Sequence, residues 1–188
     1  VKYHVGIDLL PIIPDGFQNE DWLYIVNYYG QIPDETIKAL KQKYKNVILD
    51  NVQSYYSKPI EGIDTLYSCR KYFGVADGAL LYSDFSLEED MDYDESYSKM
   101  IFLLGRYERN ATEFYADYVK NNKLIRTAPI RRMSRLTENL LHGINYAKVG
   151  ETRTKNYDFL YKELKGINRM RLKPIFAPFS YPLYINNG

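Results

Sequence analysis

The stretch VILDNVQSYY, residues 47–56, decides how this sequence is interpreted. Its apolar run ends in a carboxylate, Asp50, and an amide follows three residues later, Gln53. In open α/β sheets, ligands lie beyond the carboxyl ends of the strands, so Asp50 is a candidate ligand-binding residue. Asp is also a preferred turn residue, and an Asp that ends a strand can simply stabilise a turn. Both interpretations stay open for Asp50 taken alone.

The sequence on both sides of this stretch predicts an α/β sheet. Residues 21–30 are aromatic and β-branched, which indicates a buried strand, and residues 46–50 form a second apolar run. Between them, residues 33–45 have helical periodicity, with Asp34 as the expected N-cap. Two further strands are predicted at 64–68 and 78–83. Strand, helix and strand with short links are typical of a βαβ unit.

Beyond the strands the pattern changes. Helices are predicted within residues 98–122, 131–144 and 145–167, and the apolar run at 175–185 predicts a last strand.

Composition limits the class of protein. The chain has 188 residues, 45% hydrophobic and 26% charged, which predicts a globular chain of one domain, or one domain and part of another. A net charge of +1 gives no overall signal for nucleic-acid binding. The single cysteine, Cys69, favours a reducing compartment. The sequence shows neither a signal peptide nor an apolar run of membrane-spanning length, so we expect a cytoplasmic protein without a membrane partner.

A second polar cluster follows the predicted strand at 64–68. Ser68 ends that strand, Lys71 comes three residues later, and a small-residue turn, Asp77-Gly78-Ala79, leads into the next strand. A serine or a lysine alone is most often a surface residue. Together with Asp50 and Gln53, however, these residues predict one site.

This combination resembles the DegT–StrS family of sugar aminotransferases, which are fold-type I pyridoxal-phosphate enzymes. Asp50 and Gln53 match the family's Asp with Gln or His three residues later, Lys71 matches its cofactor-binding lysine, and Asp77-Gly78 matches the acidic residue and glycine that follow. The segments YIVNYYGQIPD (24–34) and MSRLTENLLHGINYAKVGETRTKNYDFLYKEL (133–164) are also similar to segments of the family.

The resemblance implies a three-layer α/β/α fold. Residues 1–145 would be the later part of the cofactor-binding large domain, and residues 146–188 the start of a small α+β domain. It also implies pyridoxal 5'-phosphate as cofactor. Asp50 would keep the ring nitrogen protonated, Gln53 would brace the ring, Ser68 would reach the phosphate, and Lys71 would bind the cofactor and act as the catalytic base.

The same resemblance implies a reaction and partners. An amino group would pass from glutamate to a keto sugar carried on a nucleotide, in a homodimer. The family's phosphate-binding turn precedes the segment that matches this chain, so we expect the chain to be a piece of a longer protein that holds part of the cofactor site.

Two other classes of function stay open. One is a truncated aminotransferase-like domain that serves as a structural or interaction module. The other is an anion-binding or nucleotide-binding module built on the basic stretch 123–135, through Arg131, Arg132 and Arg135. No metal site is predicted, because His4 and His142 have no second His or Cys at ligand spacing.

Overall fold

A computed structural model describes residues 2–86 and 90–186. The chain forms two compact units. Unit 1 comprises Val1–Tyr67, Leu81–Phe85 and Asn145–Gly188, and unit 2 comprises Ser68–Leu80 and Ser86–Ile144.

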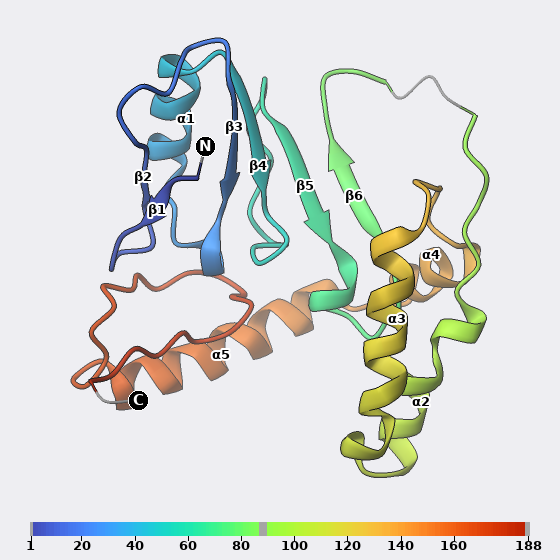
Figure 1. Ribbon diagram of the computed structural model, residues 1–188. Coiled ribbons are helices and arrows are strands. Elements are labelled where there is room, and N and C mark those ends of the chain that lie inside the picture. The colour runs from blue at the N-terminus through green and yellow to red at the C-terminus, as the bar shows by residue number, and fades with distance from the viewer. Residues whose placement is uncertain (1, 87–89, 187–188) are drawn as a thin grey trace. The chain divides into compact units, whose positions relative to one another are not determined.

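The strands of the main sheet are those that the sequence predicts. In the described residues, β3 (Trp22–Val26), β4 (Asn46–Asp50), β5 (Asp64–Ser68) and β6 (Ala79–Tyr82) form a sheet in the order β3-β4-β5-β6. The first three are parallel, and the arrow of β6 runs opposite to that of β5 (Figure 1). This mixed sheet with its helices confirms the α/β class.

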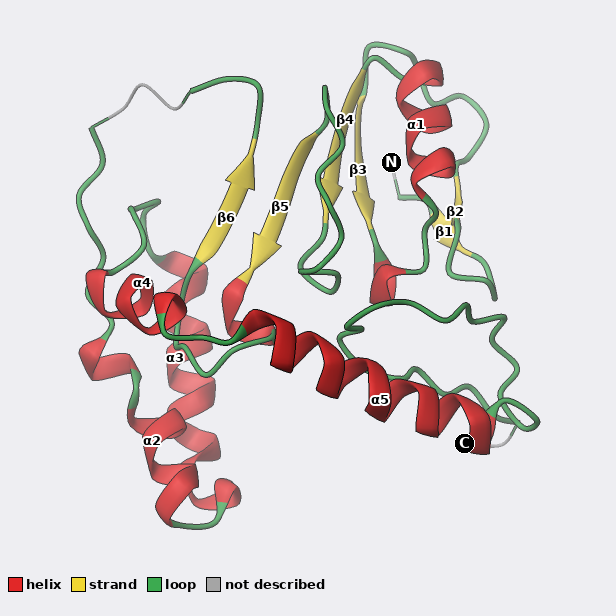
Figure 2. Ribbon diagram, turned by 180° about the vertical axis from the view of Figure 1, so that it is seen from behind, coloured by secondary structure: helices red, strands yellow, loops and turns green. Residues whose placement is uncertain are grey.

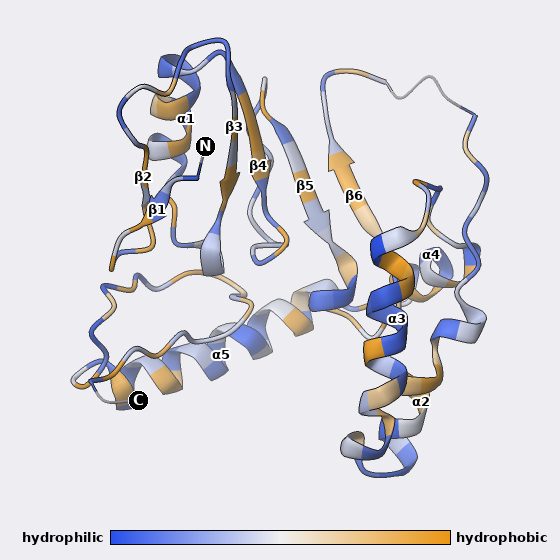
Figure 3. Ribbon diagram, in the orientation of Figure 1, coloured by the Kyte–Doolittle hydropathy of each residue, from blue (hydrophilic) through white to orange (hydrophobic). Residues whose placement is uncertain are grey.

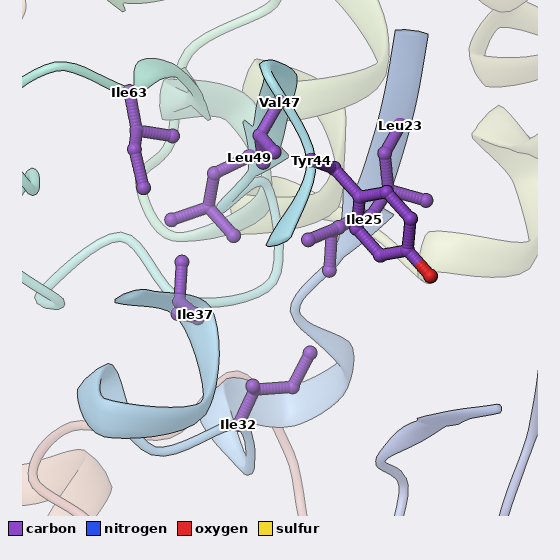
Figure 4. Packing of buried hydrophobic residues seen from close by; sticks show 8 residues of the cluster. All are labelled: Leu23, Ile25, Ile32, Ile37, Tyr44, Val47, Leu49 and Ile63. Carbon is purple, nitrogen blue, oxygen red and sulfur yellow. The ribbon is translucent and has the colours of Figure 1, made fainter. Parts of the chain in front are cut away.

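One face of the sheet packs against α1 (Asp34–Lys43). Alternate residues of β3 and β4 point to this face, as the period of two of a strand requires. Hydrophobic colour runs along much of β3 and β4 in Figure 3. Figure 4 shows the resulting core, in which the buried side chains are Leu23, Ile25, Ile32, Ile37, Tyr44, Val47, Leu49 and Ile63.

The start of α1 corrects one prediction. The N-cap position is occupied by Pro33 in an extended conformation, and Asp34 is the first helical residue. Proline is well suited to this boundary because its fixed φ is compatible with a helix start. Asp34 therefore acts as an acidic residue of the first turn, where it interacts favourably with the helix dipole.

Helix α5 (Tyr146–Leu164) lies within unit 1, as the periodicity of residues 145–167 predicts. Its N-cap is Asn145, whose side chain accepts a hydrogen bond from the Lys148 N–H at 3.0 Å. Figures 1 and 2 both show α5 running across the end of the sheet toward which β3, β4 and β5 point. The carboxyl ends of the parallel strands are therefore covered by this helix and by the chain that follows it.

The predicted strand at 175–185 is wrong. These residues are all described, and they form an irregular segment rather than a strand. Pro178 and Pro182 interrupt the apolar run, and proline cannot donate to a strand ladder. A short pair of strands that the sequence did not predict, β1 (His4–Val5) and β2 (Pro11–Ile12), is antiparallel.

Unit 2 is mainly helical. Its helices are η2 (Cys69–Lys71), η3 (Tyr97–Lys99), α2 (Ile101–Glu108), η4 (Ala111–Phe114), α3 (Tyr115–Thr127) and α4 (Arg135–His142). The helical region predicted at 98–122 is thus interrupted, because the Asn110 side chain accepts a hydrogen bond from the Thr112 N–H and starts a new turn. A small core joins Ala76 to α2 through Met100, Phe102 and Leu103.

The compact units and the predicted domains divide the chain differently. Residues 145–188 belong to the same unit as most of the sheet. The predicted boundary between a large domain, residues 1–145, and a small domain, residues 146–188, comes from the family resemblance. It stays a prediction. In the part of the chain that the structure describes, every helix is too short or too polar to cross a membrane.

Candidate functional site

Asp50 is the last residue of β4, at the carboxyl end of a central parallel strand. It is 8% exposed. The Tyr24 hydroxyl donates to its Oδ2 at 2.8 Å, and the Val52 N–H donates to its Oδ1 at 2.9 Å. Each oxygen of this buried carboxylate therefore has one donor from the chain.

The register of the sheet explains the contact with Tyr24. Val26 of β3 lies opposite Asp50, and Tyr24 lies opposite Ile48. Residues two apart share a face of a strand, so Tyr24 is the diagonal neighbour of Asp50. Burial and the negative charge of Asp50 raise the pKa of Tyr24 well above its usual range. At neutral pH the Tyr24 hydroxyl is consequently a proton donor to the carboxylate.

Two buried asparagines lie directly beyond the ends of β3 and β4. Asn27 Nδ2 donates to Asn51 Oδ1 at 3.0 Å, and Asn27 Oδ1 accepts from the Ile32 N–H at 3.1 Å. The Asn27 N–H donates to the carbonyl of Asp50 at 3.0 Å. These bonds fix the first turn after each strand, and with it the position of the Asp50 carboxylate.

Gln53 is half-buried in the turn that follows Asp50. Its neighbour Ser54 lies against Gly30, whose φ is +72°. A Cβ built on Gly30 would lie 2.7 Å from Ser54 Oγ and 2.9 Å from a carbon of Ile175. Glycine is therefore required at position 30 by both its backbone conformation and the close approach of the Gln53 turn.

Aromatic residues connect this turn to α5. The Tyr56 hydroxyl donates to the carbonyl of Tyr146 at 2.9 Å, and the Tyr56 ring meets Phe176 edge to face at 5.6 Å. Farther along α5, the Tyr157 hydroxyl donates to the carbonyl of Lys173 at 3.0 Å. Burial raises the pKa of Tyr157 to about 12, so it remains a donor at neutral pH. Hydrogen bonds from tyrosine hydroxyls thus join the Gln53 turn to the start of α5, and α5 to the segment around Lys173.

Ser68 and Lys71 lie in unit 2, around the turn after β5. Ser68 occupies the N-cap position of η2, and Lys71 is the last residue of η2. The Cys69 N–H donates to the carbonyl of Gly78 at 3.0 Å, which holds this turn against the turn formed by Asp77 and Gly78. Lys71 is half-buried and lines a cavity of about 480 Å³ in unit 2.

The turn at Asp77 and Gly78 is anchored to α4. The Thr137 hydroxyl donates to Asp77 Oδ1, and Ser134 Oγ and Ser96 Oγ are 2.5 Å apart beside it. Burial raises the pKa of Asp77, and the hydrogen bond from Thr137 opposes this shift. Gly78 has a φ of +98°, and a Cβ there would lie 3.1 Å from Thr137 Cγ2. Only glycine fits this conformation easily.

The arginines of the basic stretch have partners within unit 2. The guanidinium groups of Arg132 and Arg135 lie 5.7 Å and 5.0 Å from the ring of Tyr93. Arg131 Nη1 is 4.0 Å from Asp94 Oδ1. The hypothesis of a separate anion-binding module on this stretch stays untested.

The four predicted site residues therefore form two pairs. Asp50 and Gln53 lie in unit 1 at the carboxyl end of β4, whereas Ser68 and Lys71 lie in unit 2 at the turn after β5. The sequence analysis missed Tyr24, Asn27 and Asn51. The alternation of β3 could have placed Tyr24 and Val26 on one face, but their pairing with β4 requires the register.

Comparison with known proteins finds no matching family model, no matching curated protein and no matching solved structure. Among the described residues, no group of three or more His, Cys, Asp or Glu side chains could hold a metal ion.

Proposed function

We propose that this chain is part of a pyridoxal-phosphate-dependent aminotransferase of fold type I. The observation that carries the proposal is Asp50, a buried carboxylate at the carboxyl end of a central parallel strand. Ligands of open α/β sheets lie at this edge. The turn after the next strand carries Lys71, the residue type that binds the cofactor aldehyde in such enzymes.

The chemistry of the Asp50 carboxylate fits the ring nitrogen of the cofactor. An ionised carboxylate has about four acceptor positions. Two of them receive hydrogen bonds, from the Tyr24 hydroxyl and the Val52 N–H. The others remain for a donor such as a protonated pyridine nitrogen. The two donors of the chain orient the carboxylate, which is how supporting residues prepare a binding group.

When bound, pyridoxal phosphate supplies an electron sink for the negative charge that develops on the substrate carbon. Asp50 holds the proton on the ring nitrogen, because a nearby opposite charge favours the charged form. Gln53 braces the ring and Ser68 binds the phosphate. Lys71 binds the cofactor through Nζ and then moves the substrate proton with the same atom.

The family resemblance extends the proposal to substrates and assembly. Glutamate is the proposed amino donor and a nucleotide-linked keto sugar the proposed acceptor. The enzyme is proposed to be cytoplasmic and to complete its sites across a homodimer.

Borohydride reduction tests the role of Lys71. The intact protein is incubated with pyridoxal phosphate and reduced, and its peptides are mapped by mass spectrometry. The pyridoxyl group is expected on Lys71. The variant Lys71→Ala should remain unlabelled, while Lys120→Ala, which changes an exposed lysine of α3, should be labelled like the parent. A pyridoxyl group on another lysine, with Lys71 unmodified, would refute the assignment.

A further inference from the structure

Unit 2 contains a cavity of about 480 Å³ between the turn after β5 and helices α2 and α3. Sites for small molecules typically have volumes of roughly 300–1,000 Å³. The cavity is therefore large enough for an organic ligand, and much larger than a single inorganic ion needs.

The charge of the cavity has one sign. Arg70, Lys71 and Arg106 line it, and among the described lining residues there is no Asp or Glu. Asn122 Oδ1 accepts a hydrogen bond from Arg70 Nη1 at 2.9 Å, which orients the guanidinium group. A guanidinium has five N–H donors in a planar fork, so one bond to Asn122 leaves most of them for a phosphate or carboxylate.

Aromatic rings form much of the remaining wall. Phe102 is buried and meets Tyr118 edge to face at 5.5 Å. Tyr118 is 43% exposed and Tyr107 is 86% exposed, so both rings are accessible to a ligand. Exposed aromatic rings next to cationic groups are suited to stack on a flat ring while the cations bind its anionic group.

We propose that this cavity binds an organic anion in which a phosphate is linked through a sugar to a planar base, as in a nucleoside monophosphate. Arg70 and Arg106 bind the phosphate, and the tyrosine rings contact the planar group. The inference rests on the cavity alone and does not depend on transamination. Lys71 also lines the cavity, but the tests below change only the two arginines.

Calorimetric titration of the intact protein with adenosine 5'-monophosphate, adenosine and inorganic phosphate tests the proposal. The monophosphate should bind at least about tenfold more tightly than either of the other two probes, because only it satisfies both parts of the cavity. Equal affinities for the monophosphate and adenosine, or no binding of the monophosphate at millimolar concentration, would overturn the proposal.

Substitutions then locate the site. Arg106 is exposed, so Arg106→Met should fold normally, and it should weaken binding of the monophosphate about tenfold without changing that of adenosine. Arg126→Met removes the same charge from an exposed position of α3 outside the cavity and should bind like the parent. Equal losses in the two variants would show nonspecific attraction and contradict the assignment.

Arg70 separates charge from geometry. Arg70→Lys keeps the positive charge but replaces the planar fork that Asn122 orients, so binding of the monophosphate should weaken by severalfold. Binding at the parental affinity would remove Arg70 from the site.

Discussion

Asp50 in unit 1 and Asp77 in unit 2 are each 8% exposed, but their surroundings differ. Asp50 receives donors from a neighbouring strand and from its own turn, at the carboxyl edge of the sheet. Asp77 accepts the hydroxyl of Thr137 among buried serines at the start of α4, and burial raises its pKa. Burial alone therefore does not mark a functional carboxylate. The position of Asp50 is suited to ligand binding, and that of Asp77 to joining a turn to a helix.

The largest expected effect concerns Asp50 and tests the role proposed for it. Asp50→Asn keeps the shape of the side chain but removes the charge that, in the proposed site, would hold the ring nitrogen of the cofactor protonated. In the intact protein with pyridoxal phosphate and glutamate, the rate of amino transfer should fall by at least about 100-fold, as the loss of roughly two pKa units at this contact would require. The rate is measured from the change in cofactor absorbance.

The matched control is Asp64→Asn. Asp64 is the first residue of β5, so it lies at the amino end of its strand, whereas Asp50 lies at the carboxyl end of β4. Its Oδ1 accepts a hydrogen bond from the Ser83 hydroxyl at 2.6 Å. The rate should stay near that of the parent. If Asp50→Asn transfers amino groups as fast as the parent, the role proposed for Asp50 is wrong.

An intermediate effect concerns the hydroxyl donors. Thr137→Val and Tyr24→Phe each remove the hydroxyl that donates to a buried carboxylate. Thr137 is 0% exposed and Tyr24 is 43% exposed, so water can replace only the second donor. We expect the free energy of unfolding in urea to fall by about 2 kcal/mol for Thr137→Val and by less than about 1 kcal/mol for Tyr24→Phe. The reverse order would show that the two sites are not distinguished by their access to water.

The smallest effect is the pH dependence of Asp77. Burial raises its pKa in the folded protein above the ordinary value of 3.8. The positive charge of Lys99 lowers this pKa, and the negative charge of Asp94 raises it. The folded protein therefore binds the proton more tightly than the unfolded chain. The resulting stabilisation is complete below the ordinary pKa and is lost as the pH rises through the raised one.

Asp77→Asn should remove this dependence. The difference in the free energy of unfolding, variant minus parent, should rise between pH 4 and pH 7. This rise should be smaller than the loss of stability expected for Thr137→Val. The variant Asp158→Asn, which changes an exposed carboxylate of α5, serves as the reference for the general effect of removing one carboxylate. A flat difference for Asp77→Asn would mean that Asp77 titrates normally.

The sequence by itself determined the local elements. The apolar run at 46–50, the aromatic and β-branched run at 21–30 and the helical periods at 33–45 and 145–167 predicted β4, β3, α1 and α5. Each of these patterns is local, because it depends only on neighbouring residues of one helix or strand. It also indicated which polar residues end the strands, since Asp50 and Ser68 follow directly from those boundaries. The run at 175–185 misled the prediction because Pro178 and Pro182 interrupt it and cannot donate to a strand ladder.

Only the tertiary structure decided which side chains meet. The contact of Tyr24 with Asp50 and that of Asn27 with Asn51 depend on the register of two strands joined through α1, and the partner of Asp77 lies 60 residues away on α4. A periodic pattern fixes the face on which a residue lies, but not the residue opposite it. That choice is made by the packing of the whole sheet and of each helix, which buries some polar groups and supplies their donors from distant parts of the chain.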